Sequence, residues 1–215
     1  MKERTGATRL CLVRHGETAW NAEGRVQGQL DIPLSEVGLA QARAVAAVLG
    51  NESFCAIYSS DLIRVRQTAQ PSAERLGLPV SLDPNLRERH YGAFQSMTYS
   101  EAKDRMPEEY ARFRAKEPDF AFRSGESLAR FNERALACID SLIKKHAGQS
   151  LLIFTHGGVL EMVYRHATGR GLSSARDFEI PNAAINRIEI GAQGWRIVAW
   201  AGIGHLSVAL DDLPD

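Results

Sequence analysis

Four side chains, Arg14, His15, Arg64 and His156, combine residue types and placement that could do chemistry. Each follows, within a few residues, a short apolar run typical of a buried strand. Glu88 adds one carboxylate from a less regular stretch. Two guanidiniums, two imidazoles and one carboxylate are too much charge to bury without a counter-ion. A tetrahedral anion suits two forked donors, so phosphate is the expected ligand.

The same groups would support phosphoryl transfer. A neutral imidazole can attack phosphorus and form a phosphohistidine, so His15 and His156 are both candidate nucleophiles. The neighbouring arginines should lower the imidazole pKa and keep the ring neutral. Glu88 is the candidate general acid that protonates the departing alkoxide, and afterwards the base that activates water. An apolar setting near a dianion would raise the pKa of this carboxyl.

Glycines follow both histidines. Gly16 and Gly157 would let backbone amides approach an oxyanion closely, and Gly157 opens a predicted helix whose N-terminus favours negative charge. The sequence has no GxxxxGK[ST] loop, no HExxH pair and no carboxylate cluster beside its dispersed histidines. We therefore expect catalysis with no metal and no cofactor.

The elements that would position these residues alternate along the chain. Buried strands are predicted at 10–13 and 54–58, and further strands at 79–82 and 151–154. Helices are predicted at 35–50, with Ser35 as N-cap and Val37, Ala40, Ala44 and Val48 buried, at 59–77, capped by Ser59-Ser60-Asp61, and at 127–145 and 159–167. Segments 184–190 and 195–200 predict a closing hairpin. This alternation predicts a mostly parallel sheet with helices on both faces.

Ligands bind such sheets beyond the carboxyl ends of the strands. Arg14-His15, Ser59-Ser60-Asp61 and Thr155-His156-Gly157 all occupy that kind of position, so we expect three strand ends to converge on one pocket. The stretch of about 89–125 mixes aromatic and charged residues, with Pro107 and Pro118 as breakers. We interpret it as a helical lid insertion within a single domain that spans 1–215.

The composition excludes some classes of binding partner. A chain of 215 residues suits one large α/β domain, and 26 basic against 26 acidic residues give no overall field for nucleic acid or an anionic membrane. Three cysteines without CxxC spacing argue against disulfides and zinc, and no leader or membrane segment is indicated. We expect a cytoplasmic protein that binds a small-molecule phosphate ester, with no nucleic-acid or membrane partner. An exposed edge hairpin would permit a homodimer.

Six segments in order resemble the signatures of the histidine phosphatase superfamily, in its phosphoglycerate mutase-like branch. The resemblance covers about Leu10 to Leu206 and implies a three-layer α/β/α sandwich. The segments are LVRHGETAWN, GRVQGQLDIPLSEVG, YSSDLIRVRQTA, LRERHYGAF, SGES and LLIFTHGG.

The resemblance assigns roles by position. It makes His15 the phosphorylated nucleophile and Glu88 the proton donor and acceptor, while Arg14, Arg64 and His156 bind the phosphoryl group. Four further residues match positions that line the phosphate pocket: Asn21, Gln27, Gly28 and Gly157.

Departures from the mutase pattern favour a metal-independent phosphomonoesterase that acts on a small phosphorylated metabolite. Gln27 stands where mutases of this branch carry serine or threonine, and Gly158 where they tend to have asparagine. The insertion is shorter and lacks their adjacent arginine pair. The alternatives are a 2,3-bisphosphoglycerate-dependent phosphoglycerate mutase and, more remotely, an inactive phosphate-binding scaffold. Taken singly, Arg64 could be a surface residue that pairs with Asp61, and Glu88 part of an exposed charge run.

Overall fold

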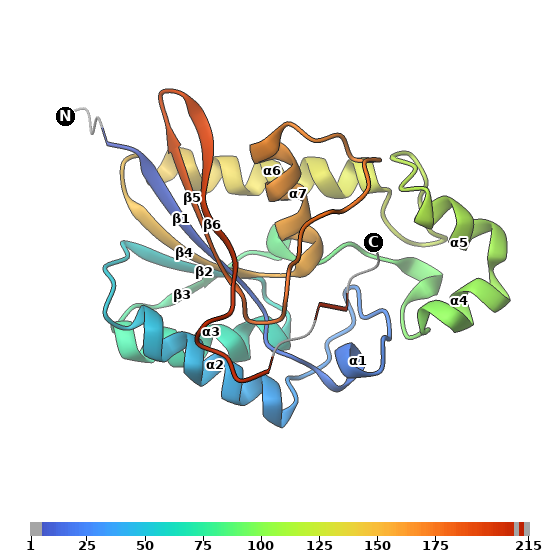
Figure 1. The fold of residues 1–215 in the computed structure, drawn as a ribbon, viewed down its shortest axis with the longest axis horizontal. Coiled ribbons are helices and arrows are strands. Elements are labelled where there is room, and N and C mark those ends of the chain that lie inside the picture. Colours follow the sequence, from blue (N-terminus) through green and yellow to red (C-terminus); the bar gives the residue numbers. More distant parts are fainter. Residues whose placement is uncertain (1–5, 209–210, 213–215) are drawn as a thin grey trace.

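The computed structural model describes residues 6–208 and 211–212 and has one six-stranded sheet at its centre. The strands are β1 (Thr8–Arg14), β2 (Ala56–Ser59), β3 (Val80–Leu82), β4 (Ser150–Thr155), β5 (Ile185–Gly191) and β6 (Gly194–Gly202). They lie in the order β3-β2-β4-β1-β5-β6 (Figure 1). The first four are parallel, and β5 and β6 form an antiparallel hairpin beside β1. The predicted mostly parallel sheet is confirmed.

Helices cover both faces of the sheet, as Figure 1 shows. These are α2 (Glu36–Leu49) and α3 (Ile63–Leu76) on one face, and α6 (Leu128–Lys145) and α7 (Gly157–Thr168) on the other. Side chains of β1 alternate between the two layers because successive strand residues point to opposite faces. Leu10 and Leu12 pack with residues of α6 and α7, whereas Cys11 and Val13 pack with residues of α2 and α3. The predicted three-layer α/β/α sandwich is confirmed.

Two helix details differ from the sequence prediction. Ser35 caps α2 as expected, but the helix leaves Val37 42% and Val48 43% exposed. Ala40 is exposed as well, and Ala44 is half-buried. Apolar residues occupy most positions of this helix, so more than one face fits the pattern. Ser59-Ser60-Asp61 does not cap α3, because the N-cap is Leu62 and has no side-chain bond. The residues that α2 buries are Gly38, Gln41, Ala42, Val45, Ala46 and Leu49.

Between β3 and α6 the chain forms an irregular segment that includes the lid, residues 89–125. Its helices are η1 (Pro84–Leu86), η2 (Gly92–Phe94), α4 (Tyr99–Arg105) and α5 (Pro107–Arg114). The lid has an apolar cluster of its own, formed by Phe94, Ala102, Phe120 and Phe122. Pro107, predicted as a breaker, instead begins α5, where its missing N–H would have no partner in any case.

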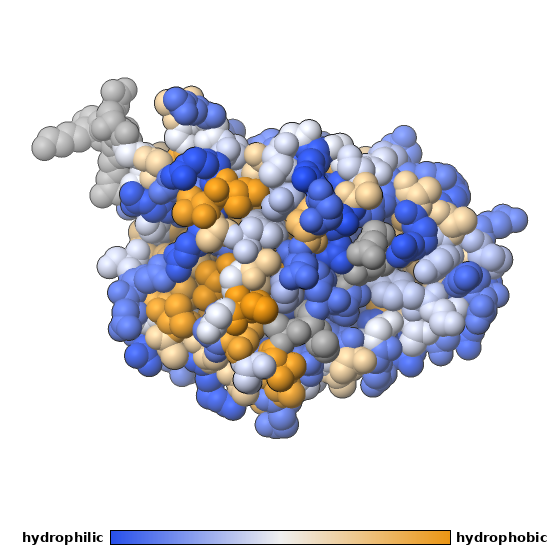
Figure 2. Space-filling view, in the orientation of Figure 1, coloured by the Kyte–Doolittle hydropathy of each residue, from blue (hydrophilic) through white to orange (hydrophobic). Residues whose placement is uncertain are grey.

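Hydrophobic side chains gather on the surface over β6 and α2, whereas the lid side is largely hydrophilic (Figure 2). Val48, Val198, Ile203 and Val208 are among the exposed apolar residues. Within the described residues, no helix has the length and apolar character needed to cross a membrane.

Candidate active site

Three neighbouring parallel strands, β2, β4 and β1, have their carboxyl ends at the same edge of the sheet. Arg14 at the end of β1 lies opposite Thr155 of β4, and Ser59 of β2 lies opposite Phe154 of β4. A pocket opens at this edge, which we call the anion pocket. Its lining residues are Arg14, His15, Asn21, Arg25, Val26, Gln27, Gly28, Arg64, Glu88, Tyr91, Tyr99 and Asp212. The structure thus brings together most of the predicted site residues from distant segments, whereas His156 and Gly157 do not line this pocket.

His15 is only 3% exposed, and its backbone is fixed from two sides. Its N–H donates to Thr155 O (2.9 Å), and its carbonyl accepts from the N–H of Ala183 (3.1 Å). The ring Nδ1 lies 2.8 Å from Gly16 O. Because a carbonyl only accepts, Nδ1 carries the hydrogen and Nε2 keeps its lone pair.

The pKa of His15 lies well below its ordinary value of 6.5, so the imidazole is neutral at neutral pH. Burial is the largest cause, and the charges of Arg64 and Arg14 come after it. The predicted direction is confirmed, but the arginines are the lesser cause. A buried, neutral imidazole with an open lone pair is a competent nucleophile.

Backbone carbonyls hold both arginines in place. Arg14 Nη1 donates to Ile180 O (2.6 Å), and Arg64 donates to Leu30 O (2.8 Å) and Gly28 O (2.7 Å). The Nε atoms of both arginines are buried and have no hydrogen-bond partner among the described residues. Burial lowers the pKa of Arg64 to about 10, so it stays charged at neutral pH. Two fixed, buried cations whose Nε–H groups lack a partner favour the binding of an anion.

The surface alternative for Arg64 is wrong, because this side chain is 1% exposed. Asp61 pairs with Arg87 instead (2.6 Å).

His156 is buried beside Arg64, and both of its ring nitrogens are engaged. Nδ1 lies 3.2 Å from Arg64 Nη2 and accepts, since a guanidinium only donates. Nε2 then carries the hydrogen and donates to Ser60 Oγ (2.9 Å). The rings of His15 and His156 lie 5.3 Å apart, centre to centre. His15 is therefore the better placed nucleophile, and Ser60, interpreted from the sequence as part of a helix cap, orients His156.

The loop residues present further polar groups to the anion pocket. Asn21 Oδ1 accepts from Thr18 N (2.8 Å), which turns Nδ2 toward the pocket as a donor. Gln27 is buried, and its Oε1 has no partner among the described residues. Gly28 has a left-handed backbone (φ 53°) and lines the pocket.

The two glycines after the histidines differ in role. Gly157 is the buried first residue of α7, as expected. The expectation that the Gly16 amide approaches an oxyanion is wrong, because this N–H donates to Thr68 Oγ1 (2.9 Å).

Glu88 is 7% exposed, so its interpretation as part of an exposed charge run is wrong. Its carboxylate accepts from the N–H groups of Arg89 (2.7 Å) and Gly158 (2.9 Å). The pKa of Glu88 is raised above its ordinary value of 4.5, because burial outweighs these two hydrogen bonds and the nearby arginines. A Cβ atom on residue 158 would lie 2.1 Å from Glu88 Oε1, so only glycine leaves room for this carboxylate.

Asp212 lies in the anion pocket, although no pattern in the sequence pointed to it. Its carboxylate accepts from Arg14 Nη2 and from Asn21 Nδ2 (2.7 Å). The preceding residue, Asp211, accepts from Arg176 Nη1 (2.7 Å) and from the N–H of Ile180 (2.8 Å). An oxyanion of this chain thus contacts donors expected to hold phosphate.

Comparisons with known proteins identify the family of this chain. Residues 10–202 match the family model of the histidine phosphatase superfamily, branch 1. The metal-independent phosphoserine phosphatase of Arabidopsis thaliana is 39% identical over 210 residues, which cover 96% of this chain and 87% of that protein. The phosphoglycerate mutase-like protein 4 of the same plant is 39% identical over 92% of this chain and 86% of its own length.

A solved structure shows the same fold. The mycobacterial glucosyl-3-phosphoglycerate phosphatase, in complex with VO3, superposes with a TM-score of 0.81 at 30% identity, over 91% of this chain and 99% of the other. Within residues 6–208 and 211–212, no group of three or more His, Cys, Asp and Glu side chains is placed to hold a metal ion. The chain therefore belongs to branch 1 of the histidine phosphatase superfamily and is a phosphatase.

Proposed function

We propose that the chain hydrolyses the phosphomonoester of a small metabolite through a phosphohistidine at His15. The observation that carries this proposal is the open Nε2 of a neutral, buried His15 beside two arginines whose Nε–H groups lack partners. The guanidiniums of Arg14 and Arg64 and the amide of Asn21 would hold the phosphoryl oxygens. Gln27, Gly28, His156 and Gly157 would complete the wall of the site.

In the first step, the lone pair of His15 Nε2 attacks phosphorus, and the bond between phosphorus and the ester oxygen breaks. Glu88 gives its proton to that oxygen, so the alcohol leaves as a neutral molecule. In the second step, a water oxygen attacks phosphorus while the Glu88 carboxylate takes a proton from the water. The P–N bond breaks, its electron pair returns to Nε2, and inorganic phosphate leaves.

Mutation and trapping of the intermediate test this mechanism together. His15→Ala should lose several orders of magnitude in kcat with p-nitrophenyl phosphate, because the nucleophile is gone. Rapid acid-free quenching of the native enzyme with a radiolabelled ester should leave base-stable, acid-labile phosphate on the protein. Full activity of His15→Ala would exclude the mechanism.

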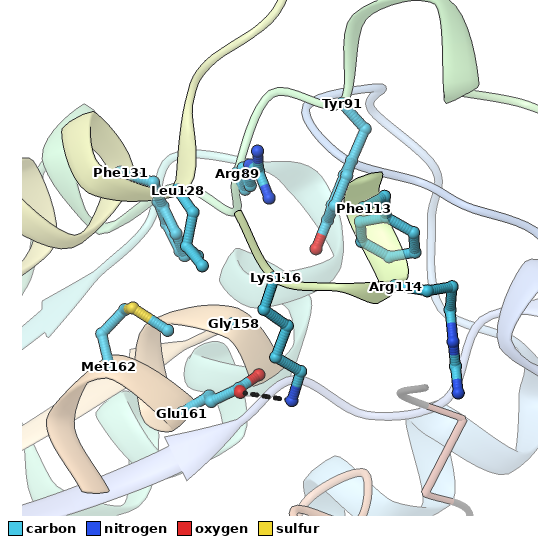
Figure 3. A pocket seen from close by; sticks show the side chains of 10 residues that line it. All are labelled: Arg89, Tyr91, Phe113, Arg114, Lys116, Leu128, Phe131, Gly158, Glu161 and Met162. Carbon is cyan, nitrogen blue, oxygen red and sulfur yellow. Dashed lines mark hydrogen bonds and ion pairs between the residues drawn. The ribbon is translucent and has the colours of Figure 1, made fainter. Parts of the chain in front are cut away.

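The leaving group would enter a second pocket beside Glu88, because the acid must reach the leaving oxygen. This leaving-group pocket lies between the lid and the helices α6 and α7 (Figure 3). Leu128, Phe131 and Met162 form its apolar side, opposite Tyr91 and Phe113. Tyr91 lines both pockets, and Gly158 lines this one while it binds Glu88.

Positive charge exceeds negative charge in the leaving-group pocket. Arg89, Arg114 and Lys116 line it beside a single carboxylate, that of Glu161, which Lys116 (3.3 Å) shares with Arg165 outside the pocket (2.7 Å). Buried Arg89 donates to the carbonyls of Glu126 and Phe120, and no carboxylate of the described residues pairs with it. We infer that the substrate carries a carboxylate on its alcohol part, as in phosphoserine. The Arabidopsis relative named a phosphoserine phosphatase supports this choice.

Two substrates that differ by one carboxylate test the choice. O-Phosphoserine should be cleaved with a kcat/KM about tenfold or more above that of O-phosphoethanolamine, which lacks the carboxylate. Lys116→Gln should reduce this preference, while p-nitrophenyl phosphate turnover stays within about twofold. Equal rates for the two substrates would exclude carboxylate recognition.

Mutase activity is a second candidate, favoured by the phosphoglycerate mutase-like relative. It differs only in the acceptor of the phosphoryl group, which would be a phosphoglycerate in place of water. Release of inorganic phosphate from 3-phosphoglycerate, with no exchange of the 2- and 3-isomers when 2,3-bisphosphoglycerate is added, would exclude this alternative.

We also propose a cytoplasmic location with no nucleic-acid partner. The zero formal charge supports the absence of a nucleic-acid partner. Three cysteines without CxxC spacing support the cytoplasmic location. Cell fractionation and a heparin column at low salt test the two parts.

A homodimer through β6 is a further proposal. This nine-residue strand forms one edge of the sheet and includes the exposed apolar residue Val198. Two copies could pair their β6 edges in antiparallel fashion. Sedimentation analysis of the native chain and of Val198→Asp, which should weaken the dimer, tests the proposal.

A further inference from the structure

The proton donor proposed above lies on a stretch of backbone without regular structure. Glu88 follows η1, and residues 87–91 belong to no helix or strand. A catalytic group on such a segment needs restraint from outside, because proton transfer depends steeply on distance and angle. The SGES segment and Arg134 lie outside the anion pocket, and the roles assigned so far do not include them.

Arg134 on α6 binds this stretch through its carbonyl groups. Nη1 donates to Asn85 O (2.8 Å) and Arg87 O (3.1 Å), and Nη2 donates to Glu88 O (3.3 Å). Nε and Nη2 donate to the two carboxylate oxygens of Glu126 (2.8 and 2.9 Å). These bonds match the five N–H donors of a guanidinium, so no donor remains for another role.

Glu126, the acidic residue of SGES, binds the residues that follow Glu88. Its N–H donates to His90 O (2.8 Å), its carboxylate accepts from His90 N (3.3 Å), and its carbonyl accepts from Arg89 Nε (3.0 Å). A Cβ atom on residue 125 would lie 2.7 Å from His90 O, so Gly125 permits this close contact. The pair therefore holds the backbone on both sides of Glu88.

We propose that the Arg134–Glu126 ion pair is a positioning device that aims the Glu88 carboxyl at the leaving oxygen. This inference rests on the proposed acid role of Glu88. Gln29 Nε2 also donates to Glu88 O (3.0 Å), so this carbonyl is held from the α6 side and from the loop of the anion pocket. The carboxylate itself is left to contact the N–H groups of Arg89 and Gly158 and the reacting groups.

A series of leaving groups tests the proposal. Alcohols of high pKa need protonation as they leave, whereas p-nitrophenolate does not. Arg134→Met should lower kcat about 10- to 100-fold for an alkyl phosphate such as O-phosphoserine, and less than about threefold for p-nitrophenyl phosphate. Arg187→Met is the matched control, because Arg187 makes a similar two-bond ion pair with Glu52 away from the site. It should leave both rates unchanged.

A double variant shows whether Arg134 acts through Glu88. In the Glu88→Gln background, Arg134→Met should cost less than about threefold more with the alkyl phosphate. Its full effect in that background, or an equal loss with both kinds of leaving group, would overturn the proposal. If Arg134→Met does not fold, Glu126→Gln takes its place with the same expected pattern.

The Glu88→Gln single variant distinguishes a failure of the positioning role from a failure of the proposed acid role of Glu88. If it slows alkyl phosphates selectively but Arg134→Met and Glu126→Gln do not, only the positioning role is wrong. If Glu88→Gln itself shows no dependence on the leaving group, the proposed acid and the inference both fail.

Discussion

The anion pocket and the lid are built in different ways. In the anion pocket, His15 and His156 follow the ends of neighbouring parallel strands, and the arginine side chains bind backbone carbonyls of the surrounding loops. The lid consists of short helices and irregular segments around an aromatic cluster of its own. The first is fixed by the main sheet, and the second is packed mostly against itself.

We propose that this difference separates the chemistry from the choice of substrate. The lid meets the anion pocket through Tyr91 and Tyr99, which line it, and through bonds to its loop such as the backbone bonds of Val26 with Ser96 and Met97. The groups expected to react with phosphate all come from outside the lid, which adds Tyr91 and Tyr99 to the wall of the anion pocket. We expect substitutions in the anion pocket to slow every substrate alike, and substitutions around the lid to slow substrates unequally.

The largest effect is expected at the centre of the anion pocket. Arg64→Met removes a buried donor, the partner of His156 and the support of the loop at Gly28. It should lower kcat/KM about 10³- to 10⁴-fold for aryl and alkyl phosphates alike. Arg66→Met, on the exposed side of the same helix, is the control and should change little. A loss that depends strongly on the leaving group would contradict the division drawn here.

Glu88→Gln should have the second largest effect, and this effect should depend on the leaving group. We expect a loss of about 10²- to 10³-fold for alkyl phosphates and much less for p-nitrophenyl phosphate, measured as kcat at saturation.

The pH profile gives Glu88 a second test. Its raised pKa means that the acid form persists above the ordinary value of 4.5, and kcat/KM should fall as pH rises through that pKa. Glu88→Gln should abolish this fall. At the acidic end, activity should decline only at a pH well below 6.5, where His15 becomes protonated. An unchanged alkaline limb in Glu88→Gln would assign that limb to another group.

Gly158→Ala tests the contact between α7 and the Glu88 carboxylate. The added Cβ would lie 2.1 Å from Glu88 Oε1 and must displace the carboxylate. We expect a loss of about tenfold or more with alkyl phosphates, and a smaller loss with aryl phosphates. Gly204→Ala is a matched control, because no other atom lies within 4 Å of a Cβ at that position. Equal kinetics of the two variants would show that Glu88 tolerates the shift.

Asp212→Asn should have the smallest effect, and in the opposite direction. Its carboxylate contacts Arg14 and Asn21, so a substrate phosphate has to displace it. The variant should lower KM about two- to tenfold for all substrates and strengthen inhibition by inorganic phosphate, with kcat nearly unchanged. Asp104→Asn, an exposed change on α4, is the control. A raised KM would instead make Asp212 part of substrate binding.

The sequence allowed the sheet, the major helices and the meeting of strand-end residues to be predicted, because those features depend on local patterns. Gly77, for example, ends α3 with a left-handed backbone (φ 64°), as its type predicts. Contacts between distant segments could not be predicted in the same way. Asp212 meets Arg14 from 198 residues further along the chain, and no periodicity records that contact.

Other misses came from residues that fit two roles. Ser60 has the type and place of a helix cap, but a tertiary bond to His156 occupies it. The presence and the ends of α2 could be predicted, but its buried face could not, since apolar residues line both sides of the helix. The lid follows no long period, because its short helices pack through an irregular aromatic cluster.

The separate aromatic cluster of the lid has a consequence for motion. A part with its own small core can open by itself, at a lower free energy than global unfolding. Backbone amides of α4 and α5 should then exchange with deuterium sooner than those of β1 and β4. Escape of the alcohol past the lid, and not the cleavage of a bond, would set the turnover rate for substrates that bind the lid best.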